Sequence, residues 1–140
     1  MTTYSGEITL ETKGEPQIID ITSEVEGHVE SSGIKSGLIT VFVTGSTGAI
    51  TTLEYEPGLL KDLPAAFERF APREAVYEHH LRWQDGNGHS HVRAAIIGPS
   101  LTIPIIKRRL PLGTWQQIVF LELDVRPRQR KLIVQVIGEK

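Results

Sequence analysis

Alternating apolar and polar positions recur along most of the chain and predict strands. Ile8 and Leu10 stand two apart within residues 5–12, which predicts a strand at a sheet edge. Residues 38–43 are β-branched and continuously apolar, so we expect a strand buried on both faces. Further strands are predicted at residues 50–55, 75–83, 101–110, 114–124 and 131–137. Short turns separate the last three, and this spacing is typical of an antiparallel meander.

Two segments in the first half have helical spacing instead. Ile21, Val25 and Val29 repeat every four residues before Gly33, which predicts a helix that ends at that glycine. A second helix is predicted over residues 59–70. Strands therefore dominate, and the pattern predicts an α+β protein with two helices in its N-terminal half. A length of 140 residues fits one domain, spanning residues 1–140.

Composition excludes several classes of protein. With no cysteine, the chain offers neither disulfides nor thiolate ligands. The first residues lack a secretory signal, and no apolar run is long enough for a bilayer, so we expect a cytoplasmic protein without a membrane partner. Arg126, Arg128, Arg130 and Lys131 lack aromatic neighbours, and we interpret them as a solvated hairpin, with Arg128 the best candidate for a further role. Nucleic acid is therefore not an expected partner.

Charge is distributed unevenly along the chain. Residues 1–70 carry 4 basic and 11 acidic side chains, whereas residues 71–140 carry 11 basic and 6 acidic ones. This asymmetry permits complementary contacts between subunits or a basic pocket for an anionic ligand.

Candidate chemistry concentrates in residues 79–91, which hold four of the five histidines. His89 and His91 alternate around a serine, and on extended backbone both rings would face one side, as chelation of a metal requires. His79 and His80 are adjacent, so on a strand only one of them can face a pocket. The alternative is a polar turn, because Asp-Gly and Asn-Gly pairs are common in hairpins and a histidine there needs no ligand.

Several segments together resemble the YjbQ family over nearly the whole chain. The resemblance rests on residues 37–50, 85–94, 98–104 and 112–118, and its most specific parts are the Gly-His-Ser-His-Val-Arg-Ala and Leu-Gly-Thr-Trp-Gln-Gln runs. It implies a compact α+β protein built on a β-sandwich, usually a homotrimer, with the histidine loop facing a pocket near a subunit boundary. Some members are described as secondary thiamine-phosphate synthases, which join an aminopyrimidine diphosphate to a thiazole phosphate and release pyrophosphate.

The resemblance and the residue types together suggest a polar pocket and two alternative functions. The first is a transferase of the thiamine-phosphate synthase type, and the alternative is a protein that binds a metal, a phosphate or another small anion without turnover. Catalytic candidates are His91, Asp85 and Glu54; candidates for binding the phosphorylated ligand are Arg93, Ser46, Thr47 and Asn87. His80, His89 and His91, with Glu54 or Asp85, could hold zinc, manganese or magnesium. The imidazoles could instead donate to phosphate oxygens. Trp115 is expected in the core, because it would share a strand face with Val119 and Leu121.

One departure from the family pattern matters for this pocket. Many members carry histidine where this chain has Gly45, and many lack the histidine found here at position 89. We therefore hypothesise that His89 replaces the missing imidazole within the same pocket.

Overall fold

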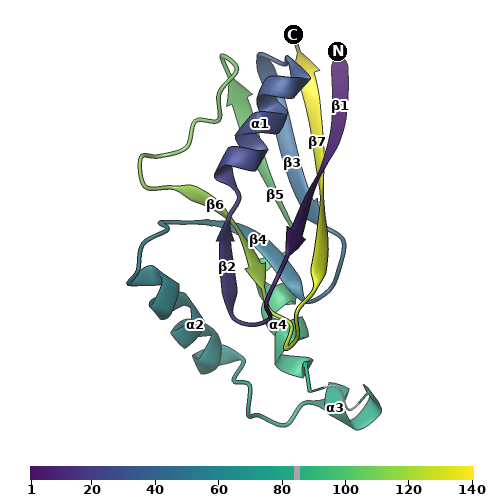
Figure 1. Cartoon of the computed structure of the whole chain (residues 1–140), viewed down its shortest axis with the longest axis vertical. Helices are drawn as coiled ribbons and strands as arrows, with labels where there is room; N and C mark the ends of the chain where they lie inside the picture. Colours follow the sequence, from purple (N-terminus) through teal and green to yellow (C-terminus); the bar gives the residue numbers. More distant parts are fainter. Residues whose placement is uncertain (84–85) are drawn as a thin grey trace.

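The computed structural model describes residues 1–83 and 86–140, apart from the side chains of residues 82 and 83. Within these ranges the chain forms seven strands and four helices (Figure 1). The strands are β1 (Thr2–Glu11), β2 (Gln17–Asp20), β3 (Ser36–Val43), β4 (Gly48–Leu53), β5 (Ser100–Ile106), β6 (Gln117–Glu122) and β7 (Gln129–Glu139). The helices are α1 (Thr22–Ser32), α2 (Leu59–Phe70), α3 (Glu78–Trp83) and α4 (Gly88–Ile97). The α+β class and both helices of the N-terminal half are confirmed.

The strands form two antiparallel sheets. The first has the order β1-β7-β3-β5 and the second the order β2-β6-β4. β1 lies at an edge, as its alternating sequence predicts. The predicted meander is wrong, because β5, β6 and β7 do not pair with one another. The connections 107–116 and 123–128 carry the chain from one sheet to the other, so the predicted hairpin around Arg126 is a crossover between sheets.

Two apolar cores hold these layers together. The first lies between the sheets and under α1, with Val41, Val134 and Phe120 among its fully buried members. The second lies on the opposite face of the smaller sheet, where Val119 and Leu121 pack against residues of α2 and α4. Figure 1 shows α1 across one end of the larger sheet, with α2, α3 and α4 gathered near the other end.

The strand buried on both faces is β6, and the prediction of two buried faces for residues 38–43 is wrong. β6 is the middle strand of the smaller sheet, with the first core on one side and the second core on the other. In β3, by contrast, Ile39 and Val41 face the core, whereas Leu38 and Phe42 are exposed on the outer face of the larger sheet. A continuous apolar run therefore means here that a strand has an uncovered apolar face.

Two further expectations fail locally. Residues 75–83 were expected to form a strand, but they form a loop followed by α3. Trp115 was expected in the core, but β6 begins only at Gln117, and the indole lies in the preceding loop with 71% of its surface exposed.

Candidate functional site

The His-Ser-His run lies on α4, so its predicted extended geometry is wrong. Successive residues of a helix are turned by about 100°, and His89 and His91 therefore project about 200° apart. A run of Val, Arg, Ala and Ile follows, which continues the helix to Gly98. The two rings accordingly enter different surroundings, and His89 does not join the pocket at Gly45.

His89 belongs to a buried cluster around Glu15. Its ring is fully buried, and Nε2 lies 2.7 and 2.9 Å from the two carboxylate oxygens of Glu15. Arg73 and Arg93 approach the same carboxylate at 3.1 and 3.3 Å. This carboxylate ties the loop between β1 and β2 to α4 and to the segment after α2. A buried carboxylate needs such partners, because an unpaired charge in the interior is costly.

Arg93 is committed to this cluster and is not available to a diphosphate as expected. It lies four residues after His89, so both side chains leave the same face of α4. Its guanidinium is only 3% exposed, donates to Glu68 and to the carbonyl of Ala71 at 2.6 and 2.9 Å, and stands over the Phe67 ring. The hydrogen bond from Arg93 is the main reason why the pKa of Glu68 lies below its ordinary value.

His80 packs against the start of α4. Its Nε2 accepts a hydrogen bond of 3.2 Å from the backbone N–H of Gly88, and its ring contacts Tyr77. Burial raises the pKa of the Tyr77 hydroxyl. A neutral imidazole has one lone pair, and in His80 this lone pair is occupied by the amide of Gly88. His80 is thus oriented to hold α3 against α4.

His91 lies in a cleft between α4 and the turn that joins β3 to β4. The cleft has a volume of about 370 Å³ and is lined by Gly45, Ser46, Gly48, His91, Ala94, Ala95 and Pro99. The ring of His79 lies beside that of His91, with centroids 4.6 Å apart. Of the two adjacent histidines, His79 therefore meets His91, whereas His80, the candidate metal ligand, contacts Gly88. Of the predicted site residues, this cleft brings together His91 and Ser46.

The turn at residues 45–47 presents backbone donors beside this cleft. The amides of Gly45, Ser46 and Thr47 donate to no acceptor among the described residues. Successive free N–H groups in a turn are a common way to hold an anion. The hydroxyl of Thr47, however, is already used: it donates to Asp124 at 3.0 Å and accepts from Arg130 at 2.8 Å. The side chain of Thr47 therefore positions its neighbours, and Gly45 and Ser46 are the residues of this turn that line the cleft.

A buried cluster of two carboxylates and two arginines lies behind this turn. Glu122 is fully buried and binds Arg130 through both of its oxygens, at 2.8 and 2.5 Å. Asp124 is likewise buried and binds Arg128 at 3.0 and 2.5 Å. Arg130 was interpreted as part of a solvated hairpin, but it is buried. The Glu-x-Asp and Arg-x-Arg spacings were the signal in the sequence, since each alternate pair points to one side of extended backbone.

Hydrogen bonds keep the carboxyl of Asp124 ionised. Burial alone would raise its pKa, but hydrogen bonds from Arg128, the Val125 amide, Thr47 and Asn87 outweigh burial, and the pKa lies below its ordinary value. Asn87 donates to Asp124 from a buried position at 3.4 Å, and its carbonyl accepts from the amides of Ser90 and His91. Asn87, expected at a phosphate, thus connects Asp124 to the start of α4.

The two remaining catalytic candidates do not join the cleft. Glu54 is exposed just after β4 and lines a shallow hollow with Trp115, whereas the cleft lies at the start of β4. The six residues of β4 separate these places by about 20 Å. Asp85 lies outside the described residues.

The donor set of the described residues does not fit the expected metal site. Among residues 1–83 and 86–140, no three His, Asp or Glu side chains are grouped to hold a cation. His80 and His89 contact Gly88 and Glu15 respectively, and they lie apart from the cleft of His91. A zinc site usually needs three or four such ligands in one place.

A larger cavity of about 620 Å³ lies between α1 and residues 108–110. It contains none of the predicted site residues. We place the candidate site at the smaller cleft, because an imidazole, a hydroxyl and free backbone donors meet there.

Fold and cleft define a small α+β protein of two antiparallel sheets, with a mostly apolar cleft beside a helix that also holds an imidazole and a hydroxyl. The sequence profile of the YjbQ family, described as "UPF0047 protein YjbQ-like", matches residues 6–139, and the chain belongs to this family. A UPF0047 protein of Methanothermobacter thermautotrophicus is 44% identical over 99% of this chain and 95% of its own length. One from Archaeoglobus fulgidus is 40% identical over 94% of this chain and 99% of its own.

Solved structures share the fold. A crystal structure from Sulfolobus solfataricus, described as a YbjQ-like protein of unknown function, has a TM-score of 0.94 at 36% identity and covers 99% of both chains. A hypothetical protein of Aeropyrum pernix has a TM-score of 0.90 at 34% identity, with 97% of this chain and 99% of that chain covered. Among the described residues, no helix is both long enough and apolar enough to span a membrane.

Proposed function

We propose that the cleft beside His91 binds a small phosphorylated ligand. The observation that carries this proposal is that Gly45 and Ser46, whose amides donate to no described acceptor, line the same cleft as the half-buried imidazole of His91. Phosphate offers several strong acceptor oxygens, and such backbone N–H groups bind it without the desolvation cost of a buried lysine. Ala94, Ala95 and Pro99 give the cleft an apolar wall, which suits the organic part of a ligand.

The transferase of the thiamine-phosphate synthase type is a finer form of this proposal. The family resemblance motivates it, and His91 is the cleft residue that could donate a proton to an oxygen of a departing pyrophosphate. Arg93, Asp85 and Glu54 are given no role in it. Binding without turnover is the alternative, and both forms require the same anion site.

Calorimetry with inorganic phosphate and pyrophosphate tests the binding proposal. Wild-type protein should bind at least one of them, and His91→Ala should weaken binding at least tenfold. His28→Ala is the matched control, because His28 lies on α1 and bonds Tyr4 and the carbonyl of Glu7. Absence of binding by the wild type, or equal losses in both variants, contradicts the proposal.

Turnover is tested separately. Protein incubated with an aminopyrimidine diphosphate and a thiazole phosphate should release pyrophosphate and form the joined product, measured by mass spectrometry. Binding of pyrophosphate without product favours the non-catalytic alternative. Since the described residues offer no set of three metal ligands, EDTA should leave the affinity for phosphate unchanged. Elemental analysis that finds a stoichiometric metal would instead restore the metal proposal.

We also propose that the chain forms a homotrimer through the outer face of the larger sheet. The family resemblance motivates the number three, and the surface supports the choice of face. This outer face exposes Leu38, Phe42, Ile106, Ile133 and Ile137, each between 39% and 54% accessible. The register places Leu38 opposite Ile137 and Phe42 opposite Ile133, so this face carries two apolar pairs on adjacent strands, with the polar pair of Thr40 and Gln135 between them. Exposed apolar side chains gathered on one face of a soluble protein can mark an interaction surface.

A further inference from the structure

Arg130 on β7 is a nearly buried cation with one unused end. Only 6% of its surface is exposed. Nε donates to Glu122 at 2.8 Å, and Nη2 donates to Glu122 and Thr47 at 2.5 and 2.8 Å. These bonds fix the plane of the guanidinium, because two of its three nitrogens are held by buried acceptors.

The third nitrogen, Nη1, faces the turn that lines the cleft. Nη1 donates to no described residue, yet it is not one of the fully buried polar atoms that lack a partner, so it retains contact with solvent. A Cβ atom added to Gly45 would lie 2.8 Å from Nη1. Nη1 therefore occupies the space that a side chain at position 45 would take, next to a residue that lines the cleft.

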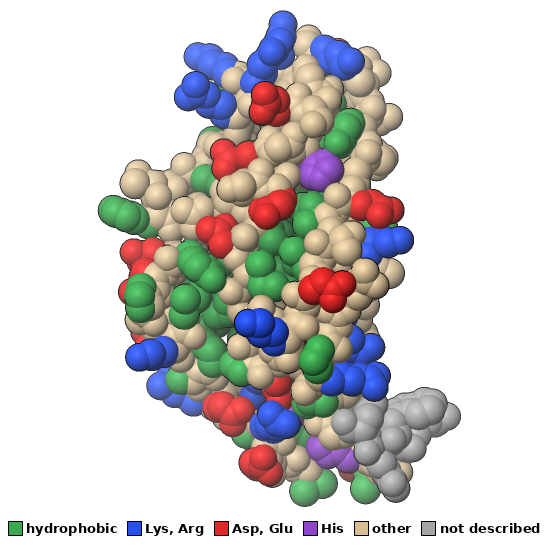
Figure 2. Space-filling view, viewed as in Figure 1, with side chains coloured by type: hydrophobic (Ala, Val, Ile, Leu, Met, Phe, Trp, Pro, Cys, Tyr) green, Lys and Arg blue, Asp and Glu red, His purple; other side chains and the backbone are tan. Residues whose placement is uncertain are grey.

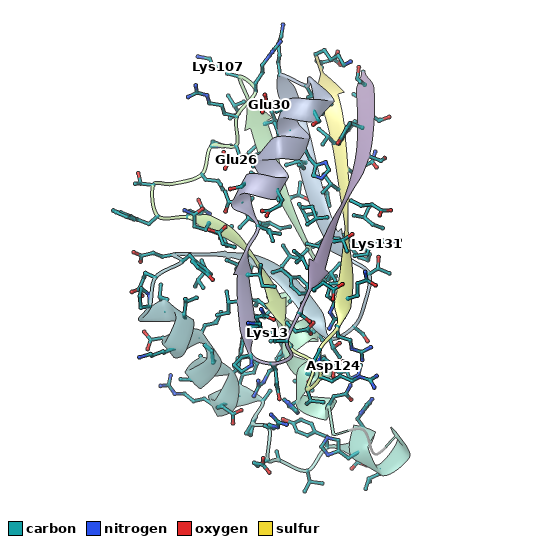
Figure 3. All side chains as sticks on the ribbon, viewed as in Figure 1. Lys13, Glu26, Glu30, Lys107, Asp124 and Lys131 are labelled. Atoms are coloured by element: carbon teal, nitrogen blue, oxygen red, sulfur yellow. The ribbon has the colours of Figure 1, made fainter. Side chains whose placement is uncertain are left out.

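The surrounding charges leave this nitrogen able to take another anion. Glu122 is matched by Arg130, and Asp124 is matched by Arg128 at 2.5 Å (Figure 3 labels Asp124 below β7). Nη1 carries two N–H groups that donate to no described acceptor, so it can donate to an oxygen atom of a ligand. Because the guanidinium is already oriented, a ligand would order no further side chain when it binds.

We propose that Arg130 is the cationic anchor of the cleft and binds a phosphate group through Nη1, beside the amides of residues 45–47. This inference rests on the proposed function and deepens it. It assigns the ligand class as a phosphate monoester or a terminal phosphate, whose dianion matches a fixed guanidinium and several N–H groups better than a carboxylate does. Gly45 has φ of +154°, a conformation in which side chains are rare, and its missing Cβ keeps Nη1 accessible.

Nitrogen-15 NMR of the arginine side chains tests the contact in the unaltered protein. Titration with inorganic phosphate should shift the Nη signal of Arg130 and leave that of Arg93 in place, since Arg93 is held by Glu15 and Glu68. Acetate at the same concentration should give no shift. Binding of phosphate without a shift at Arg130 overturns the proposal while leaving the proposed function intact. Absence of phosphate binding overturns both.

Two variants extend the test to affinity. Arg130→Lys keeps the positive charge but loses the planar guanidinium with its several N–H donors. We expect the Kd for phosphate to rise at least tenfold. Arg128→Lys makes the same change at the other arginine of the cluster and should alter the Kd less than twofold. Gly45→Ala keeps Arg130 in the sequence but adds a Cβ 2.8 Å from Nη1, so the guanidinium must shift and binding should weaken. Unchanged affinity in Gly45→Ala and Arg130→Lys contradicts the proposal. If Arg130→Lys does not fold, the NMR titration and Gly45→Ala decide.

Discussion

Gly88 shows how one small residue positions the histidine-rich region. A Cβ at this position would lie 2.6 Å from the Cβ of Tyr77 and 3.3 Å from Nε2 of His80. Gly88→Ala should therefore separate α3 from α4 and destabilise the protein by about 1–3 kcal/mol, the usual cost of overpacking. Chemical denaturation measures this change.

Gly27 provides the control for this prediction. It lies on the exposed side of α1, and an added Cβ there would meet nothing within 4 Å. Gly27→Ala should stabilise the protein by about 0.5–1 kcal/mol, because alanine restricts the unfolded chain and favours a helix. Equal effects at the two glycines would show that Tyr77 yields to the added methyl group.

Asp124 gives a pH dependence with a definite sign. Its pKa is lower in the folded protein than in the unfolded chain, where it is about 3.9. The folded state therefore binds fewer protons, so this carboxylate stabilises the protein above about pH 5 and ceases to do so as the pH falls through the folded pKa. Asp124→Asn should lower the free energy of unfolding at pH 7, by about 1.5–3 kcal/mol for hydrogen bonds to a charged group.

The same variant should also lose less stability than the wild type between about pH 5 and pH 3. Urea denaturation at several pH values measures both effects. Parallel pH profiles for wild type and variant would mean that Asp124 does not account for the acid sensitivity, leaving Glu68, whose pKa is also lowered, as the next candidate.

At the scale of elements, the turn after β5 is strained. Lys107 and Arg108 have φ of 51° and 68°, and the backbone of Ile106 and Arg109 closes the turn with hydrogen bonds of 2.9 and 3.0 Å. Two successive positive φ angles suit an Asn-Gly pair, whereas each other residue type in this conformation lowers the stability of the fold by about 1–2 kcal/mol. Arg108→Gly should thus raise the free energy of unfolding by about 1 kcal/mol in thermal or urea denaturation. A decrease would mean that the Arg108 side chain stabilises the fold by more than the strain costs.

Local pattern predicted most elements but not their surroundings. The spacing of Ile21, Val25 and Val29 gives α1 correctly, and Gly33 ends it in a left-handed conformation. The His-Ser-His run was misread because alternation of polar residues over three positions fits a strand and a helix start equally well. What selects the helix is tertiary: Arg93 and His89 both reach Glu15 only from a helical face, and Glu15 is more than seventy residues away.

The site was predictable only in part, for the same reason. His91 could be named because the Gly-His-Ser-His-Val-Arg-Ala run is specific, whereas Ser46 lies in a Gly-Ser-Thr-Gly run that is a weak signal by itself. Arg130 could not, since its burial depends on Glu122 and Thr47, which reach it from other strands. From the sequence alone, a charged residue near a proline is expected to be solvated, and only the pairing of the strands shows that Arg130 is buried.

At the scale of the whole molecule, the acidic first half and the basic second half of the chain form ion pairs with each other. Every strand pairing joins a strand before residue 54 to one after residue 99. Arg73 and Arg93 from the basic half meet Glu15 and Glu68 from the acidic half. Complementary charge thus acts inside one subunit. Figure 2 shows acidic and basic side chains interspersed over most of one face, with basic groups alone at the end near Lys107.

The proposed trimer can be tested at the apolar outer face of the larger sheet. Phe42→Lys should shift the mass measured by light scattering from three subunits to one, because a charge buried in an apolar contact is not compensated. Ser31→Lys adds the same charge on the exposed side of α1 and should leave the trimer intact. A wild-type protein that is monomeric at micromolar concentration contradicts the assembly.

The position of β7 has a consequence during synthesis. β7 lies between β1 and β3, yet it leaves the ribosome after all six other strands. β1 and β3 therefore lack their shared neighbour until late in synthesis, and the backbone N–H and C=O groups that pair with β7 have no partner strand until then. Pairings of such wide sequence separation form slowly. We expect the nascent chain to depend on chaperones until β7 emerges, and ribosome-bound chains arrested before residue 129 to remain sensitive to protease.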